Sequence, residues 1–305
     1  MSSVPSAFRS RPKLTRRNLL RGAAVGVGAL ALYAGEIERH WIDHRQITIR
    51  IAGLSTRMDG FRMVQVSDIH LEEWTEPYFL REAVQRVNAM KPDAVVLTGD
   101  FITTYSRSKR FPQEAIRRCA DILTGLECRS IHGILGNHDA QMDPAAVAST
   151  LETHGIPILR NQYVALEQGG ARLWLAGIDD MLAGRPDLDK TIPPAIRNIP
   201  DEPVILLGHE PDPALKIMRH PAGASVRLML SGHTHGGQVR LPFFGPLTLP
   251  PLGEHFVEGL FSLGTMQLYV NRGLGTVGVP FRFDCPPEIT EITLRSAESS
   301  NAITR

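Results

Sequence analysis

The sequence predicts an α/β fold in which short buried strands alternate with amphipathic helices. From Gln46 onward, short runs rich in Val, Ile and Leu are followed by longer segments with apolar residues at helical spacing. Several of the apolar runs are followed within three residues by Asp, His or Asn. The 305 residues are 43% hydrophobic and 21% charged, which is enough apolar material for a large core and is not typical of disorder. We therefore expect a single catalytic domain.

The N-terminal region has the order of an export signal. Basic residues precede the apolar run Gly22–Gly35, which is rich in Ala, Gly and Val and is short for a bilayer span of about 20 residues. Thr15–Arg21 resembles the twin-arginine signal, whose export machinery carries folded proteins; an ordinary secretory signal is the alternative. Cleavage after Ala31 or Ala34 would release the protein, whereas an uncut segment would tether it to the membrane. The basic residues are Arg9, Arg11, Lys13, Arg16, Arg17 and Arg21.

These features predict a chain with an exported domain. Residues 1–35 form an export signal or membrane tether, 36–59 a lead-in with the first strand, 60–295 the catalytic domain and 296–305 a C-terminal tail. The protein is expected in the periplasm or tethered to the membrane facing outside the cytoplasm.

The strands and helices follow from local patterns. Short apolar runs bounded by turn residues predict strands, and apolar residues three and four apart predict helices. The expected strands are Ile47–Ile51, Arg62–Val66, Ala94–Leu97, Ile131–Leu135, Leu173–Ile178, Val204–Leu207, Arg227–Leu230, Gln267–Val270 and Glu288–Leu294. The expected helices are Tyr78–Met90, Gln113–Leu123, Pro144–Thr153 and Pro213–Arg219.

Polar residues of the kind that bind metals follow five of the expected strands at their carboxyl ends. Open α/β sheets build their sites at such ends, so these loops should converge on one crevice. Taken singly, Asp68, His70 or Asp100 could be ordinary turn residues. The two histidines of Gly232–Gln238, flanked by glycines, suit metal binding far better than core filling. The residues at the five strand ends are Asp68, His70, Asp100, Asn137, His138, Asp139, His209, His233 and His235.

The order of these motifs is that of the calcineurin-like metallophosphoesterases, which the chain resembles from about Gly60 to Arg282. The resemblance implies a single domain with a four-layer α-β-β-α sandwich. Ser67–His70, Gly232–Gln238 and Asn271–Gly275 look closest to the envelope branch, which includes twin-arginine-exported phosphodiesterases and relatives of the UDP-2,3-diacylglucosamine hydrolases. Lipid A precursor hydrolases act at the cytoplasmic face, so an exported protein would be wrongly placed for that reaction.

The resemblance also implies a set of metal ligands. One ion would be held by Asp68, His70, Asp100 and His235, and the other by Asp100, Asn137, His209 and His233, with Asp100 bridging. Carboxylate, amide and imidazole ligands suit two divalent or mixed-valence ions of Mn, Fe, Zn or Co, and the metals themselves stay open. Such a pair can generate a bridging hydroxide for in-line attack on phosphorus.

Further residues are expected to act on the substrate. By resemblance His138 faces the substrate, together with Asn137, and stabilises developing charge or protonates the leaving oxygen. Asp139 would orient that imidazole as a catalytic partner, or else be a surface residue that begins the next helix. Arg272 would bind a phosphate oxygen through its forked guanidinium, or else pair with a carboxylate.

We therefore expect a metal-dependent phosphoester hydrolase, most consistent with a phosphodiesterase. The apolar loop between Arg240 and Leu263 would form a wall for a lipid-linked or sugar-nucleotide-lipid substrate, or else pack on the sheet. Alternatives are a phosphomonoesterase or a nuclease with the same site, or a non-catalytic metal-binding scaffold. The 33 Lys and Arg nearly balance the 32 Asp and Glu, so no specific nucleic-acid partner is expected. Membrane association remains open.

Overall fold

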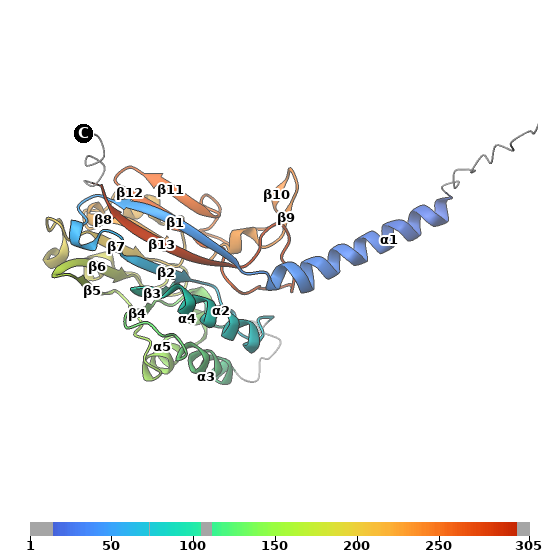
Figure 1. Cartoon of the computed structure of the whole chain (residues 1–305), viewed down its shortest axis with the longest axis horizontal. Coiled ribbons are helices and arrows are strands. Elements are labelled where there is room, and N and C mark those ends of the chain that lie inside the picture. The colour runs from blue at the N-terminus through green and yellow to red at the C-terminus, as the bar shows by residue number, and fades with distance from the viewer. Residues whose placement is uncertain (1–14, 73, 105–111, 298–305) are drawn as a thin grey trace, which may run out of the picture.

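Two mixed β-sheets form the centre of the fold in the computed structural model, which describes residues 15–72, 74–104 and 112–297 (Figure 1). Most neighbouring strands are parallel, with β13 antiparallel to β2 and both β11 and β5 antiparallel to their neighbours. The first sheet has the order β1 (Asp43–Ile51), β13 (Glu288–Ser296), β2 (Arg62–Val66), β3 (Ala94–Leu97) and β4 (Ile131–Gly133). The second has the order β11 (Gly259–Leu263), β12 (Met266–Val270), β8 (Val226–Ser231), β7 (Val204–Leu207), β6 (Ala171–Gly177) and β5 (Gln162–Gln168).

The sheets pack face to face through a largely apolar interior, which the buried Gln65 crosses to donate to the carbonyl of Ser231. Met63 and Val96 of the first sheet meet Leu175, Leu207 and Leu230 of the second in one buried cluster. Strands such as β3 and β7 are apolar at every position because both of their faces are buried.

Helices cover the outer faces. The helices α2 (Pro77–Met90), α3 (Pro112–Leu123) and α5 (Pro144–Thr153) bury apolar side chains against the first sheet. Short helices, including α6 (Leu188–Thr191) and α7 (Ala214–Ile217), cover the second sheet with the loops around them. The four-layer α-β-β-α sandwich implied by the resemblance is therefore confirmed, with one thin outer layer.

The expected elements differ from the observed ones mainly at the edges. The sequence did not predict the edge strands β5 and β11, because exposed polar residues interrupt their apolar patterns. Strand β4 ends at Gly133 rather than Leu135, and the helix expected over Pro213–Arg219 is regular only over α7. The sequence also missed the helix α4 (Asn137–Met142), which begins within the Asn-His-Asp motif. The two-residue strands β9 (Arg240–Leu241) and β10 (Gly245–Pro246) form a hairpin in the apolar loop.

The helix α1 (Arg16–Leu32) projects away from the domain and contains no buried residue (Figure 1). Helical structure continues as far as His40, and this helix is long and apolar enough to cross a membrane, a property that signal sequences share. The chain then enters β1, which pairs with β13 over its whole length. Arg9, Arg11, Lys13 and residues 298–305 of the tail lie outside the described residues.

Candidate metal centre

The strand ends bring the predicted ligands together in one buried cluster. Strands β2 and β3 deliver Asp68, His70 and Asp100, and α4 delivers Asn137 from the end of β4. Strands β7 and β8 of the second sheet deliver the remaining ligands, so the centre lies between the two sheets. All except Asn137, which is half-buried, are almost inaccessible to solvent: Asp68, His70, Asp100, His209, His233 and His235.

Ligand atoms in this cluster lie at distances that two shared cations explain. The Nε2 atoms of His70 and His235 are 3.1 Å apart, and the Nε2 atom of His70 is 3.4 Å from Oδ2 of Asp100. Nε2 of His209 is 3.2 Å from the same Asp100 oxygen, and Nε2 of His235 is 3.4 Å from Oδ1 of Asp68. Ligands bound at about 2.1 Å to one ion are separated by about 3.0 to 3.4 Å, so the spacing fits metal coordination.

Hydrogen bonds behind the imidazoles orient them toward the cluster. Nδ1 of His209 donates to the carbonyl of Thr98 at 2.7 Å, and Nδ1 of His235 faces the carbonyl of Gly275 at 3.3 Å. Nδ1 of His70 bonds the hydroxyl of Thr103 at 2.8 Å. A carbonyl oxygen only accepts, so Nδ1 of His209 carries a hydrogen atom and its Nε2 faces the cluster, where a cation would replace a proton. His233 is turned the other way, since its Nε2 bonds the carbonyl of Pro251 at 2.9 Å.

The backbone at the ligands adopts an uncommon conformation. Asp68, His70, Asp100, His233 and His235 all have positive φ, between 47° and 73°. This left-handed region is uncommon for residues other than Gly, although Asn, Asp and His adopt it more readily than most, and residues held there cluster at functional sites. The turns after β2, β3 and β8 therefore hold a strained geometry that aims several ligands at one point.

Glycines allow the turns to approach one another. A Cβ atom at Gly232 would lie 2.2 Å from Oδ2 of Asp68, and one at Gly136 would lie 2.3 Å from Oδ1 of Asp100. A Cβ at Gly99 would lie 2.8 Å from Nδ1 of His209. Such distances are impossible for a real side chain, so these three glycines are required for the ligands to converge.

Burial and neighbouring charges set the protonation of the cluster. Burial lowers the pKa of His70 and His235 well below the ordinary value, which keeps both rings neutral. Burial opposes charge on His209 as well, but the carboxylates of Asp100 and Asp68 outweigh it and raise its pKa well above the ordinary value. Burial would raise the pKa of Asp100, yet His209 holds it well below the usual range. In the absence of a metal, a proton on His209 thus balances the Asp100 carboxylate.

The donor set fits two divalent cations. Several buried side-chain atoms of the described residues have no hydrogen-bond partner, and two of them, Oδ1 of Asn137 and Nε2 of His209, belong to the cluster. A buried polar atom without a partner is costly unless a cation completes its coordination. Imidazole, carboxylate and amide ligands without cysteine are typical of Mn, Fe, Zn or Co sites.

His138 and Asp139 occupy different environments. His138 is half-buried at the edge of the cluster. Its backbone N–H donates to Oδ1 of Asp100 at 2.9 Å, and Nδ1 of its ring accepts from the backbone N–H of Thr104 at 3.2 Å. Asp139 is fully buried, and its carboxylate accepts from the N–H groups of Phe101, Ile102 and Gly136. Burial and the charge of Asp100 raise the pKa of Asp139 to about 8. Asp139 thus ties the turn after β3 to α4, and it is not a surface residue.

Arg272 is engaged with carboxylates. Its Nε donates to Glu288 at 2.6 Å and its Nη2 to Asp43 at 2.5 Å. The guanidinium therefore joins the end of β12 to β13 and β1, which matches the carboxylate pairing that the sequence left open.

Sequence reasoning missed Arg282, which is fully buried beside the cluster. Its guanidinium donates to the carbonyls of Arg272, Gly273 and Gly275, and lies 3.5 Å from Nδ1 of His235. No motif marks this residue, because its role depends on carbonyls that only the folded loop brings together.

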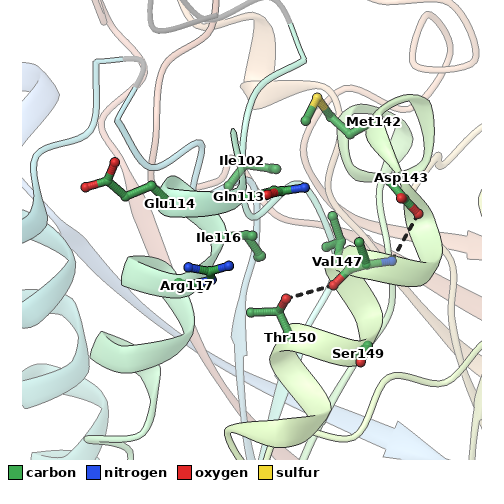
Figure 2. A pocket seen from close by; sticks show the side chains of 11 residues that line it. Ile102, Gln113, Glu114, Ile116, Arg117, Met142, Asp143, Val147, Ser149 and Thr150 are labelled. Carbon is green, nitrogen blue, oxygen red and sulfur yellow. Dashed lines mark hydrogen bonds between the residues drawn. The ribbon is translucent and has the colours of Figure 1, made fainter. Parts of the chain in front are cut away.

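A hollow of about 530 Å³ opens above the cluster. Its polar floor includes Asp100 and His138, and its walls are apolar. The walls are formed by Val239, Leu247, Leu249, Pro250, Val277 and Val279. A larger hollow of about 910 Å³ lies between α3 and α5, where Figure 2 shows Gln113, Arg117 and Thr150. That second hollow is separate from the metal ligands, because helix residues and Ile102 line it.

The comparison with known protein families agrees with the motifs and with the converging strand ends in pointing to a metallophosphoesterase. The calcineurin-like phosphoesterase model matches residues 61–237, which include every predicted metal ligand. The chain belongs to this family. Its members are metal-dependent phosphoester hydrolases that typically bind two divalent ions, and we conclude that this metallophosphoesterase is an enzyme of the same kind.

Three relatives match almost the whole metallophosphoesterase. An uncharacterized metallophosphoesterase YkuE of Bacillus subtilis is 38% identical over 93% of this chain and 99% of its own length. Phosphodiesterase YaeI of Escherichia coli is 28% identical over 92% of this chain and 99% of its own. The UDP-2,3-diacylglucosamine pyrophosphatase LpxG of Chlamydia muridarum is 27% identical over 85% of this chain and 91% of its own length. These relatives agree with the envelope branch indicated by the sequence.

Proposed function

We propose that the protein is a phosphodiesterase that hydrolyses a lipid-linked phosphoester outside the cytoplasm. The observation that carries this proposal is the apolar wall directly above a polar metal-binding floor. A phosphodiester has a group on each side of the phosphorus, and the hollow offers an apolar surface for one of them. Among its described lining residues there is no Lys or Arg to hold the second charge of a phosphomonoester.

The ligands would be divided as the family resemblance implies, with Asp100 shared between two ions. Asp68, His70 and His235 would complete one site, and Asn137, His209 and His233 the other. When bound, such a pair polarises a phosphoryl group and lowers the pKa of water toward neutrality. The apolar wall would exclude bulk water from the bound substrate, which strengthens electrostatic interactions at the phosphorus.

His138 is proposed as the group that protonates the leaving oxygen. The N–H of Thr104 donates to its Nδ1, so the neutral ring carries its proton on Nε2. A proton at this atom, at the edge of the metal floor, is available to an alkoxide that leaves the phosphorus. We assign Asp139 and Arg272 to positioning rather than to substrate contact, because their hydrogen bonds hold backbone and carboxylates.

The names of two relatives support this choice. YaeI is described as a phosphodiesterase, and LpxG as a pyrophosphatase of a diacylated sugar nucleotide. The apolar wall is consistent with a substrate that carries acyl chains, as the LpxG substrate does by name.

A substrate panel tests the proposal. Purified protein is assayed on bis(4-nitrophenyl) phosphate, 4-nitrophenyl phosphate, a phospholipid and a nucleotide-linked diacyl sugar, with added Mn²⁺ and after metal stripping. We expect turnover of the diesters, higher rates with the lipid-linked ones, and loss of all turnover without metal. Faster hydrolysis of the monoester than of every diester would overturn the proposal.

A further inference from the structure

The hairpin β9–β10 exposes two aromatic side chains at its tip. Phe243 is fully exposed and Phe244 is 85% exposed, and Leu241 and Leu247 at the base of the hairpin are also exposed. Phe243 has a φ of 70°, an unfavourable conformation for a bulky residue. Apolar side chains held in water by a strained turn usually mark a binding surface.

This hairpin is continuous with the point where α1 leaves the domain. The N–H of Arg240 donates to the carbonyl of Phe283, and the N–H of Arg282 donates to the carbonyl of Ala34. The rings of Tyr33 and Phe283 pack edge to face with centroids 6.4 Å apart. Figure 1 shows the hairpin on the side of the domain from which α1 projects.

The helix itself has the features of a membrane-spanning segment. The α-helical part that projects from the domain, α1, has 17 residues and is about 26 Å long at 1.5 Å per residue, close to the roughly 30 Å hydrocarbon layer. Arg16, Arg17 and Arg21 lie at the end far from the domain, where positive charges favour the cytoplasmic side. Trp41 is 64% exposed at the domain end, a position typical of the aromatic belt.

We propose that the face formed by Phe243, Phe244, Val279, Phe281 and Trp41 lies on the lipid bilayer that α1 crosses, with both hairpin phenylalanines inserted. Val279 and Leu247 border both this face and the hollow above the metal centre. The hollow thus opens at the membrane surface, where it receives a phosphoester whose acyl chains remain in the bilayer. The substrate part of this inference rests on the proposed function, whereas the docking part does not.

A lipid surface is the occupant that the geometry favours. The contacts of Ala34 with Arg282 and of Tyr33 with Phe283 attach the end of α1 to the domain. A membrane-spanning α1 would therefore keep this face next to the bilayer. A second protein copy would have to displace lipid from the same surface. The exposed side chains are aromatic and aliphatic, as in segments that bind at the membrane interface.

Quenching by brominated lipids tests the docking without any substrate. The full chain is reconstituted into phosphatidylethanolamine and phosphatidylglycerol vesicles with brominated acyl chains, as Phe244→Trp or, for control, Leu260→Trp. Leu260 is 45% exposed on β11, and both variants keep the three native tryptophans. We expect added quenching for Phe244→Trp alone. Equal quenching of the two variants, or cross-linking of the hairpin to a second copy in its place, would overturn the docking.

A double variant tests the consequence for the substrate. Phe243→Ser with Phe244→Ser should reduce the rate on a vesicle-borne phosphodiester by at least about tenfold, because burial of even one phenyl group is worth that factor. The rate on a soluble diester should not change, since neither residue lines the hollow. An equal loss on both substrates would overturn the inference. If the wild type hydrolyses neither diester, the proposed function fails, and the quenching result still decides the docking.

Discussion

Nε2 of His70 and Nε2 of His235 lie 3.1 Å apart on the buried floor of the metal centre. Burial lowers the pKa of both rings well below the ordinary value, so both are neutral, and without a metal the only direct attraction between these atoms is an Nε2–H···Nε2 hydrogen bond. Nδ1 of His235 faces the carbonyl of Gly275 at 3.3 Å and Nη2 of Arg282 at 3.5 Å, so its Nε2 is the nitrogen directed at the cluster. Two imidazole nitrogens at this distance are best stabilised by a metal ion between them. This pair thus links the turn after β2 to the turn after β8 at the position where a metal ion would bind.

Asp100→Asn is expected to remove metal and activity together. Asp100 approaches both His70 and His209, so its loss weakens both sites. Loss of a residue that only hydrogen-bonds to a metal ligand lowers metal affinity by roughly 10–100-fold, and we expect a larger loss here because Asp100 is itself a proposed ligand. Elemental analysis and turnover of bis(4-nitrophenyl) phosphate measure the effect, with the exposed Asp121→Asn as control. Wild-type turnover in Asp100→Asn would disprove the assigned centre.

His138→Ala is expected to keep both metals and lose most of the rate. The ring is at the edge of the cluster, and in the proposed mechanism its Nε2 proton passes to the leaving oxygen. General acid catalysis contributes about 10²–10⁴-fold, so kcat should fall within that range while metal content stays unchanged. His154→Ala, at the residue that follows α5, serves as the control. A leaving group that needs no proton should restore much of the rate; equal defects on all leaving groups would contradict the role.

Gly232→Ala is expected to disrupt the centre although it adds one methyl group. The new Cβ would lie 2.2 Å from Oδ2 of Asp68, so the turns after β2 and β8 must separate. Gly125→Ala is a matched control, since its nearest contact would be 3.2 Å. We expect at least about tenfold weaker metal binding in Gly232→Ala, as for other residues that orient ligands. Unchanged metal affinity would show that the turns need not approach so closely.

Metal binding is expected to release a proton near neutral pH. Without metal, the raised pKa of His209 keeps its proton bound through neutral pH, and the metal must displace it. Affinity should therefore rise with pH from the ordinary histidine range up to the raised value. The stability of the metal-free protein should change in the opposite direction. The contribution of charged His209 to folding is lost as pH rises through the raised pKa of that residue. Calorimetry in two buffers should give about one proton released; none would be inconsistent with this assignment.

The apolar helix is expected to remain attached to the mature protein. Ala34 and Gly35 are buried, and Oε1 of Glu38 accepts from the N–H of Cys285 at 2.6 Å, so this segment is part of the folded domain. If the twin-arginine pathway exports the folded chain, a cleavage point at Ala34 would be shielded. We expect the protein in membranes after an alkaline carbonate wash, with an intact mass. A soluble form that begins at Leu32 or Gly35 would contradict the tether.

The sequence was sufficient to predict the α-β-β-α sandwich, its central strands and the motifs at the strand ends. Apolar runs such as Ala94–Leu97 are strands buried on both faces, and this pattern is unambiguous without tertiary information. The edge strand Gln162–Gln168 could not be predicted because its outward side chains are free to be polar. The helix at Asn137 was missed because ligand residues occupy its first turn, where their function outweighs helix propensity.

The sequence by itself determined the family, the reaction class and the types of metal ligand, because these depend on which residues end the buried strands. Only the tertiary structure decided what Asp139 and Arg272 contact, since both engage backbone or carboxylates brought in from distant segments. It also placed Arg282 behind His235, and the β9–β10 hairpin on the side of the domain from which α1 projects. Such relationships depend on how loops of different strands close against each other, and no local pattern in the chain encodes them.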